Sequence, residues 1–305
     1  MSSITGIFNI LATPFTESGA LDLDSLRRLV RFQMSLGVNG LTILGVLGEA
    51  AKLNVDERRQ VMDTVLETVA GAIPVVVGTS HPDSTVCIRL SNEAREAGAA
   101  GVMIAPPPLE DKSQANIIRL YTQIAEAIGD IAIVAQDFPK INNVLMPAET
   151  LAALADAVPT VRHLKLEDPP LMQKVSAIFE HTDKLQIFGG LGGMFLLEEL
   201  ERGTHGTMTG FAFSEILIAV FQAHKAGDSA RAAAIFDRYL PLIRYENQPE
   251  INLPIRKELL RLRGAIDSAV LRQPFNSIDA GTYAEIGRVL ERVGISDPTA
   301  IITFD

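Results

Sequence analysis

Eight short runs of β-branched and other apolar residues alternate with eight longer stretches of helical periodicity, and this alternation constrains the fold most. The expected strands are 7–12, 41–44, 74–78, 101–105, 131–135, 161–166, 185–188 and 207–210. The expected helices are 22–36, 54–70, 83–97, 113–128, 147–158, 169–181, 194–202 and 214–226. Strands without polar alternation indicate a parallel sheet covered by helices. Eight such units predict an α/β protein of the (β/α)8 TIM barrel class.

The strand signal ends near residue 227, and helical stretches follow at 228–247, 251–264 and 280–294. We therefore expect a barrel over residues 1–226 and a C-terminal helical extension over 227–305. The Ala-rich run 228–235 and the basic run 256–263 could cap the barrel or form a subunit contact. We favour packed helices whose charged face is solvated.

Composition excludes several classes of partner. The 27 Lys and Arg residues against 37 Asp and Glu give a net charge of −10, which argues against nucleic acid or an anionic membrane as the main partner. Apolar runs such as 73–78 stop far short of the roughly 18 residues that span a bilayer, and the first fifteen residues lack a basic targeting segment. We expect a cytoplasmic protein. The single cysteine, Cys87, is expected to be a buried small hydrophobe.

Lys165 stands apart from the other lysines. It lies near the end of the sixth expected strand, between Leu164 and Leu166, whereas the other seven lie in polar or helical surroundings that favour a solvated role. A lysine in this place either forms a structural ion pair with a carboxylate or acts as an amine of lowered pKa that forms a Schiff base with a carbonyl. The residues alone leave both interpretations open.

Further candidates follow other strands, because barrel enzymes place their working groups at the C-terminal ends of strands. The turn 45–49 is bracketed by glycines, and its backbone amides could bind a carboxylate. The turn 189–193 leaves room for a substrate or phosphate but lacks the dinucleotide fingerprint. Strand eight offers hydroxyls that either face the pocket or satisfy backbone groups. The candidate substrate-binding residues are Gly45, Val46, Leu47, Gly48, Glu49, Gly189, Thr207 and Thr209.

Metal and hydrolase signatures are missing from the sequence. The five histidines show no helical pair with metal-ligand spacing, there is no cysteine cluster, and no Walker loop or Gly-x-Ser-x-Gly elbow occurs. We expect no metal site. His81 follows the third strand, where it either braces the loop or takes part in catalysis.

Several of these motifs are familiar together. Residues 12–15 (ATPF), the Gly45-x-x-Gly48-Glu49 turn and Lys165 followed by Glu167 resemble the dihydrodipicolinate synthase / N-acetylneuraminate lyase family of Schiff-base aldolases. The resemblance covers almost the whole chain. It implies a homotetramer built as a dimer of dimers, in which Lys165 forms an imine with pyruvate or another small-molecule 2-keto acid and no other cofactor is needed.

Departures from the family pattern concern proton transfer. The synthase carries two threonines where this chain has Val46 and Leu47, so only backbone amides remain to bind a carboxylate. The Tyr-Asn-x-Pro pattern after strand five corresponds here to Gln136–Pro139, and its nearby arginine has no counterpart at 140–142. The tyrosine after strand four is replaced within 106–108. These losses argue against dihydrodipicolinate synthesis.

Four further motifs resemble a subgroup of this family that includes 2-keto-3-deoxy-L-arabonate dehydratase. They lie at 79–81, 136–139, 208–211 and 240–247. Retro-aldol cleavage needs a base at the C4 hydroxyl, the task of the family tyrosine, whereas dehydration needs C3 deprotonated and the C4 hydroxyl protonated. We therefore expect a lyase that dehydrates a 2-keto-3-deoxy sugar acid, with Lys165 and Gln136 as catalytic residues. The alternatives are a pyruvate-dependent aldolase or retro-aldolase, and a non-catalytic binder of 2-keto acids.

The proton-transfer group is left open by the sequence. Burial would lower the pKa of Lys165, while a close carboxylate such as Glu167 would oppose this. Glu49 is either a base or an acceptor of loop amides, and the Gln136 amide cannot act as a base. Proton transfer is therefore assigned to water, Glu49, His81, a strand-eight threonine or the carboxylate of the imine.

Overall fold

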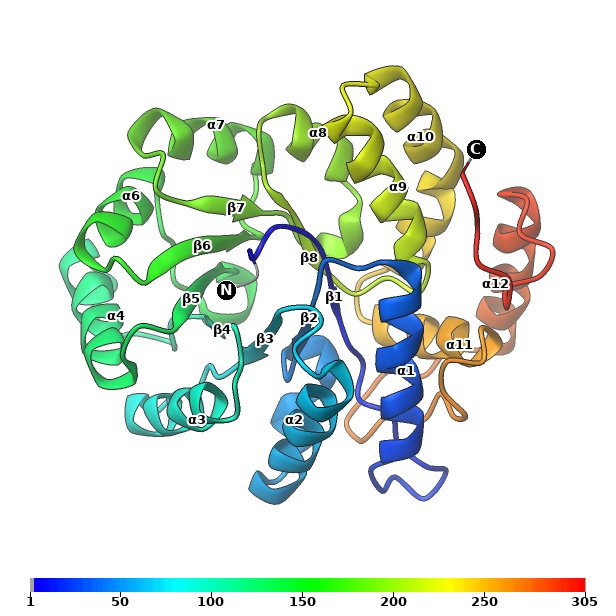
Figure 1. Ribbon diagram of the computed structural model, residues 1–305, viewed down its shortest axis with the longest axis horizontal. Helices are drawn as coiled ribbons and strands as arrows, with labels where there is room; N and C mark the ends of the chain where they lie inside the picture. The colour runs from blue at the N-terminus through cyan, green and yellow to red at the C-terminus, as the bar shows by residue number, and fades with distance from the viewer. Residues whose placement is uncertain (1–2, 305) are drawn as a thin grey trace.

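Eight parallel strands form the centre of the protein in the computed structural model, which describes residues 3–304 (Figure 1). They are β1 (Gly6–Ile10), β2 (Gly40–Ile43), β3 (Val75–Gly78), β4 (Gly101–Ile104), β5 (Ala132–Asp137), β6 (Val161–Leu166), β7 (Gln186–Phe188) and β8 (Gly206–Thr209). Their order is β7-β6-β5-β4-β3-β2-β1-β8. A parallel bridge between Gly189 and Thr207 joins β7 to β8. The predicted TIM barrel is confirmed.

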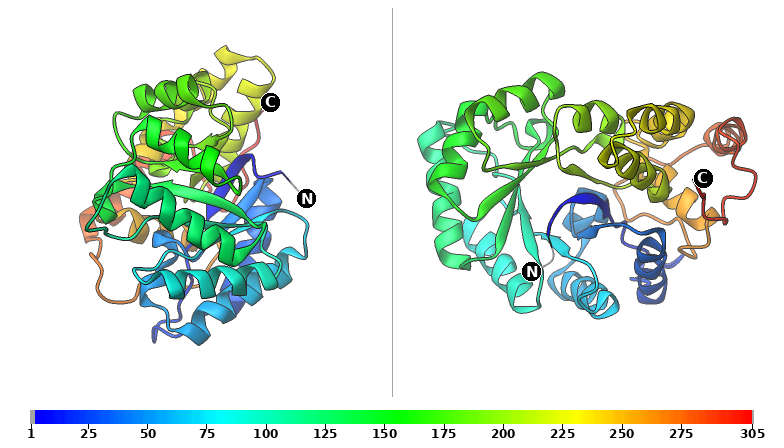
Figure 2. Two further views of the ribbon diagram at one scale, coloured as in Figure 1. Left: turned by 90° about the vertical axis from the view of Figure 1, so that its left-hand side faces the viewer. Right: turned by 45° about the horizontal axis from the view of Figure 1, so that its top comes forward.

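Helices between the strands form the outer layer, as the two views of Figure 2 show. They are α1 (Leu23–Leu36), α2 (Val55–Val69), α3 (Ser84–Glu96), α4 (Gln114–Ile128), α6 (Ala148–Ala157), α7 (Leu171–His181), α8 (Leu196–Glu201) and α9 (Ser214–Lys225). Helix α2 starts at a capping box, because the Asn54 side chain accepts from the Glu57 amide and the Glu57 side chain accepts from the Asn54 amide. Short elements that the sequence did not predict follow several strands: η1 (Val46–Gly48), η2 (Ala50–Lys52), α5 (Pro139–Asn142) and η3 (Leu191–Gly193).

Side-chain alternation along the strands separates the barrel interior from the outer core. The interior is filled by large apolar side chains at the same level of several strands, together with one from the N-terminal segment: Ile4, Phe8, Val76, Met103, Val134, Phe188 and Met208. The outward side chains pack against the helices in a larger apolar cluster, which includes Cys87 at 2% exposure. A strand residue therefore either faces the interior and the mouth above it or faces the helices.

The C-terminal extension consists of α10 (Ser229–Glu246), α11 (Asn252–Leu262) and α12 (Ala280–Arg292), beside α9 and α1 in Figure 1. Three basic residues of the run 256–263, Arg256, Lys257 and Arg263, are buried, while Arg261 is exposed, which corrects the expectation of a solvated charged face. Arg256 Nε lies 2.6 Å from Glu246 Oε1, and Arg263 Nη2 lies 2.6 Å from Glu215 Oε1. These cations can be buried because carboxylates on α9 and α10 pair with them. Within residues 3–304, no helix is long and apolar enough to cross a membrane.

Candidate active site

Lys165 lies at the C-terminal end of β6 and faces the inside of the barrel. Its register partners are Gln136 on β5 and Phe188 on β7, and Phe188 belongs to the interior cluster. Since paired residues of a parallel sheet share a face, all three side chains point inward. The Lys165 side chain is 6% exposed. The sequence therefore identified a lysine whose amine is held at the barrel mouth.

A carboxylate and an amide meet at this amine. Lys165 Nζ lies 3.0 Å from Glu167 Oε2, and Gln136 Nε2 donates to the same oxygen at 2.8 Å. A Cβ placed on Gly190 would lie 2.6 Å from Glu167 Cγ, so only glycine leaves room for the glutamate there. The structural ion pair that the sequence left open is thus present. Together with Gln136 it forms a cluster of three side chains: Lys165 is capable of covalent chemistry, Glu167 of proton transfer and Gln136 of hydrogen bonding.

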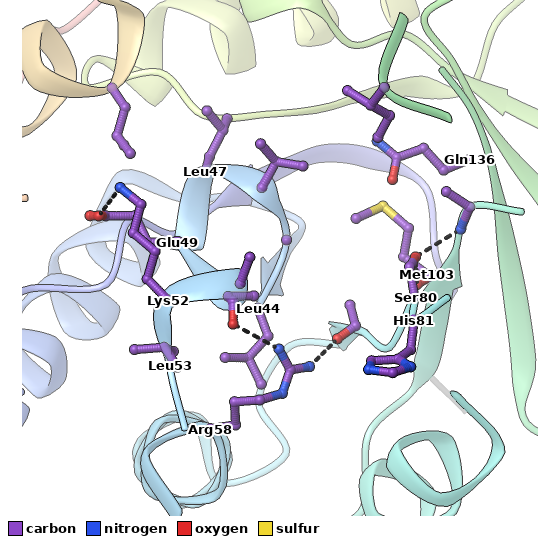
Figure 3. A pocket seen from close by; sticks show the side chains of 18 of the residues that line it. Leu44, Leu47, Glu49, Lys52, Leu53, Arg58, Ser80, His81, Met103 and Gln136 are labelled. Atoms are coloured by element: carbon purple, nitrogen blue, oxygen red, sulfur yellow. Dashed lines mark hydrogen bonds and ion pairs between the residues drawn. The ribbon is translucent and has the colours of Figure 1, made fainter. Parts of the chain in front are cut away.

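A pocket of about 1090 Å³ opens beside Gln136 (Figure 3). Gln136 and Met103 lie on one side of it, and Leu47 and Glu49 lie on the other. Lys165 is absent from the described lining residues, although its strand neighbour Gln136 is one of them. Strand ends, loops and the extension all contribute to the wall: Gly45, Val46, Leu47, Glu49, Ser80, His81, Met103, Ala105, Gln136, Ile141, Leu271, Pro274 and Phe275.

The turn after β2 forms part of the wall of this pocket. Val46 and Leu47 stand at the N-terminal end of η1, where an amide has no partner within its own helix. The Gly45 carbonyl accepts from the amides of Gly48 at 3.1 Å and Ala50 at 3.4 Å, which closes the turn. Thr13 Oγ1 donates to the Gly48 carbonyl at 2.7 Å and ties the turn to β1's loop. This arrangement can bind a carboxylate through backbone alone.

The backbone before this turn is strained and tightly packed. Leu44 has a φ of 57°, a left-handed conformation that costs a branched residue free energy. Its carbonyl oxygen would lie 2.4 Å from a Cβ on Gly78, so β3 must end in glycine. Arg58 donates to the carbonyls of Gly78 at 3.0 Å and Ala50 at 3.3 Å, which links β3 to the turn (Figure 3).

Glu49 accepts hydrogen bonds on both carboxylate oxygens. Oε1 accepts from Lys257 Nζ at 2.7 Å, while Oε2 accepts from Lys52 Nζ at 3.1 Å and from the Arg272 amide at 3.0 Å. Its side chain is 1% exposed. Burial lowers the pKa of Lys257 to about 8, although the Glu49 carboxylate opposes this shift. The sequence left open whether Glu49 is a base or a structural acceptor of hydrogen bonds. This geometry is that of a structural acceptor.

The candidates on β7 and β8 are not brought to the pocket. Met208 pairs with Phe8 inside the barrel, so Thr207 and Thr209, which alternate with it, point outward to the helices. Neither threonine is among the described lining residues, and Thr207 Oγ1 is buried without a hydrogen-bond partner within residues 3–304. The hydroxyls therefore do not meet Lys165. Sequence position alone could not give the face that they occupy.

Gly189 makes room for a second buried carboxylate. A Cβ on Gly189 would lie 1.8 Å from Glu199 Oε2, so the Glu199 side chain occupies the place of the missing side chain. Glu199 is 2% exposed, and its Oε2 has no partner in the described chain. Burial, together with the charges of Glu198 and Glu167, raises the pKa of Glu199 to about 8. Gly189 thus packs against a buried carboxyl whose raised pKa favours the protonated form, and no sequence pattern indicated this contact.

His81 lies on the pocket wall with its ring engaged by its own loop. The amide of Asp83 donates to His81 Nδ1 at 3.0 Å, which is a loop-bracing contact. Sequence reasoning missed Met103, Ile141 and Phe275 as parts of the wall. Among residues 3–304, no three His, Cys, Asp or Glu side chains gather as metal ligands.

The chain is similar to known proteins over almost its full length. The model of the dihydrodipicolinate synthetase family matches residues 3–293. L-2-keto-3-deoxyarabonate dehydratase from Azospirillum brasilense is 33% identical over 293 residues, which are 94% of each chain. A 4-hydroxy-tetrahydrodipicolinate synthase from Methanospirillum hungatei is 29% identical, covering 94% of this chain and 98% of its own. The crystal structure of dihydrodipicolinate synthase from Rhodopseudomonas palustris superposes with a TM-score of 0.90 at 37% identity. The match covers 94% of this chain and 97% of that chain.

Proposed function

Because the chain belongs to the dihydrodipicolinate synthetase family and is therefore a lyase, we propose that it dehydrates a 2-keto-3-deoxy sugar acid through an imine on Lys165. One observation carries the proposal: the Lys165 amine lies 3.0 Å from the Glu167 carboxylate at the mouth, with Gln136 bound to the same oxygen. The 33% identity to the A. brasilense dehydratase supports the substrate class.

Glu167 supplies the first proton transfer. Its Oε2 accepts the proton of the Lys165 ammonium, which leaves a neutral amine to attack the C2 carbonyl. Glu167 returns that proton to the carbinolamine hydroxyl, which leaves as water, so that the imine forms and the carboxylate is regenerated. Because Glu167 remains next to the imine nitrogen, it is also close to C3, one bond beyond C2. The same carboxylate therefore serves as the base for C3.

Elimination follows from the imine. The Lys165 nitrogen accepts the electrons when C3 loses its proton to Glu167. Those electrons then expel the C4 hydroxyl, which leaves as water with the proton that Glu167 carries. Gln136 holds Glu167 in place and lines the pocket where the substrate enters. Its amide cannot remove a proton from a hydroxyl, so Gln136 cannot be the base at the C4 hydroxyl that aldol cleavage requires. None of the described lining residues is a tyrosine.

The turn 45–48 is assigned to the substrate carboxylate. Val46 and Leu47 line the pocket at the N-terminal end of η1, and we assign their amides as donors to the two carboxylate oxygens. Such neutral donors can bind an anion without an opposing cation. Val46 and Leu47 therefore bind through backbone while their side chains provide an apolar wall.

Product analysis tests the proposed reaction. Turnover of 2-keto-3-deoxy acids should yield the dehydrated product, such as 2-ketoglutarate semialdehyde from the five-carbon acid, without pyruvate. Release of pyruvate would show the aldolase instead. Binding of keto acids without any turnover would show the non-catalytic binder. Lys165→Met should abolish turnover, while the exposed Lys184→Met is the matched control and should retain it.

Assembly and location belong to the same proposal. We expect a cytoplasmic homotetramer, a dimer of dimers, with a small-molecule keto acid as its ligand. Large apolar side chains exposed on this chain support contact with other copies, including Leu145 at 62% and Phe195 at 40%. Light scattering should give a mass near four times the 33.0 kDa of the chain, and a monomeric mass would contradict the tetramer.

A further inference from the structure

Glu49 connects the carboxylate-binding turn to the C-terminal extension. It follows η1 directly and adopts a left-handed conformation with a φ of 54°. Its Oε1 accepts from Lys257 of α11, and its Oε2 accepts from the amide of Arg272, which lies 223 residues further along the chain. One carboxylate thus joins two segments that are remote in sequence. Its unfavourable backbone conformation persists because these contacts fix it.

Lys257 is committed entirely to this junction. Its side chain is 0% exposed, and besides Glu49 it donates to the Val270 carbonyl at 2.7 Å. Its ammonium lies 4.4 Å from the centre of the Phe15 ring, a cation–π contact. A buried ammonium with three such partners has no freedom to move independently of them. Any shift of the extension therefore displaces Glu49.

The extension segment at this junction is also held by a second ion pair. Arg272 binds the Glu57 carboxylate with both Nη atoms, at 2.8 and 2.5 Å, and its guanidinium lies 4.5 Å from the Phe15 ring. Lys52 bonds both Glu49 and the Arg272 carbonyl. Residues 270–272 are consequently attached to the turn and to α2 from several directions.

Both segments joined by Glu49 line the same pocket. Gly45, Val46 and Leu47 lie just before Glu49, and Leu271, Pro274 and Phe275 lie at or just after the segment that Lys257 and Arg272 hold. The position of the turn amides relative to this wall is therefore set by the Glu49 carboxylate. In Figure 3, Glu49 and Lys52 lie on the edge of the pocket opposite Gln136.

We propose that Glu49 and Lys257 are positioning residues that hold the amides of Val46 and Leu47 for the substrate carboxylate, so that the C-terminal extension sets the affinity for 2-keto acids. This inference rests on the proposed function, because it concerns binding at the same site. Neither side chain contacts the reacting atoms. Losing either one shifts the turn and weakens keto-acid binding, while Lys165 and Glu167 keep their geometry.

Trapping with borohydride separates binding from chemistry. The protein is incubated with increasing pyruvate and reduced, and the fraction of trapped chain gives the half-saturating concentration and the maximal yield. For Glu49→Gln and Lys257→Met we expect half-saturation to rise at least about tenfold, since a misplacement near 1 Å has effects of this order. The maximal yield should stay unchanged. With the sugar acid, KM should rise in the same proportion while kcat changes little.

Glu215→Gln is the matched control. It breaks the buried pair with Arg263, which also ties the extension to the barrel but lies outside the described pocket lining. The pyruvate concentration that half-saturates this variant should stay within about twofold of that for the parent, as expected for a change remote from the site. Half-saturation within twofold for both Glu49→Gln and Lys257→Met would overturn the proposal, and so would an equal rise in the control. If one test variant fails to fold, the other decides by the same criterion.

Failure of the proposed function would look different. If the parent protein forms no adduct with any keto acid, the imine is refuted, and hydrogen exchange then tests the positioning role alone. Glu49→Gln and Lys257→Met should speed exchange in both 45–52 and 270–276, whereas Glu215→Gln should not. Unchanged exchange in either segment would overturn the inference.

Discussion

Glu199→Gln should remove a pH dependence that the buried carboxyl imposes on stability. Burial raises the pKa of Glu199 from 4.5 to about 8. Between these values the folded chain retains a proton that the unfolded chain releases. The stabilising contribution is therefore complete below pH 4.5, decreases as the pH rises, and is lost above about pH 8.

The magnitude follows from linkage. At about 1.4 kcal/mol per pH unit, the interval from pH 5 to pH 8 corresponds to roughly 4 kcal/mol of unfolding free energy. Relaxation around a buried charge lowers such values, so we expect about 2–4 kcal/mol. Glutamine has nearly the same shape and stays neutral, so it keeps the packing against Gly189 but has no proton to lose.

Urea unfolding of the parent and Glu199→Gln at pH 5, 6, 7 and 8 tests this reasoning. The free energy of unfolding of the parent minus that of the variant should fall by about 2–4 kcal/mol from pH 5 to pH 8. Other titrating groups contribute equally to both proteins and cancel in this difference. A difference that is constant with pH would refute the claim that this carboxyl is protonated in the folded protein. A difference that grows with pH would reverse the sign and refute it equally.

Glu167→Gln should lower kcat by about 10²–10⁴ in steady-state assays, since a positioned base contributes this much; an unchanged kcat would exclude Glu167 as the base. Gly78→Ala places a Cβ 2.4 Å from the Leu44 carbonyl and should cost about 1–3 kcal/mol in urea unfolding. A neutral result would show that this approach is not tight. Burial lowers the pKa of His163 to about 4, so the unfolded chain binds a proton first as the pH falls below 6.5, and stability is lost toward pH 4. His163→Phe should lessen this acid sensitivity in urea titrations between pH 6.5 and 4, and an identical profile would contradict it.

The barrel was predictable because each strand and helix has its own local period. Eight units of alternating pattern leave few ways to bury all the apolar faces, and the observed strand order follows that of the sequence. The element α5 was missed because four residues cannot display a helical period. The same holds for the 3-10 turns that shape the loop after β2.

The Lys165 site was partly predictable for a related reason. A lysine within an apolar strand is unusual, and strand alternation already placed Glu167 on the same side. The outward direction of Thr207 and Thr209 was not predictable, because it depends on the register between β8 and β1. Residues near a strand end alternate faces, and the sequence does not say which face is inside.

The other buried lysines escaped sequence reasoning because their partners are remote. Lys257 is buried only because Glu49, 208 residues earlier, neutralises it. Lys174 is likewise held by Asp137 and Asp168, each at 2.6 Å. On a helical wheel both look like solvated charges. Residues 271–276, which complete the pocket, have no periodicity that would assign them to it.

Peptide mapping after borohydride reduction tests the central claim most directly. The protein is reduced in the presence of pyruvate or a 2-keto-3-deoxy acid, digested, and analysed by mass spectrometry. We expect one modified lysine, Lys165, and no adduct in Lys165→Met. Modification of another lysine, or no adduct with any keto acid in the parent protein, would contradict it.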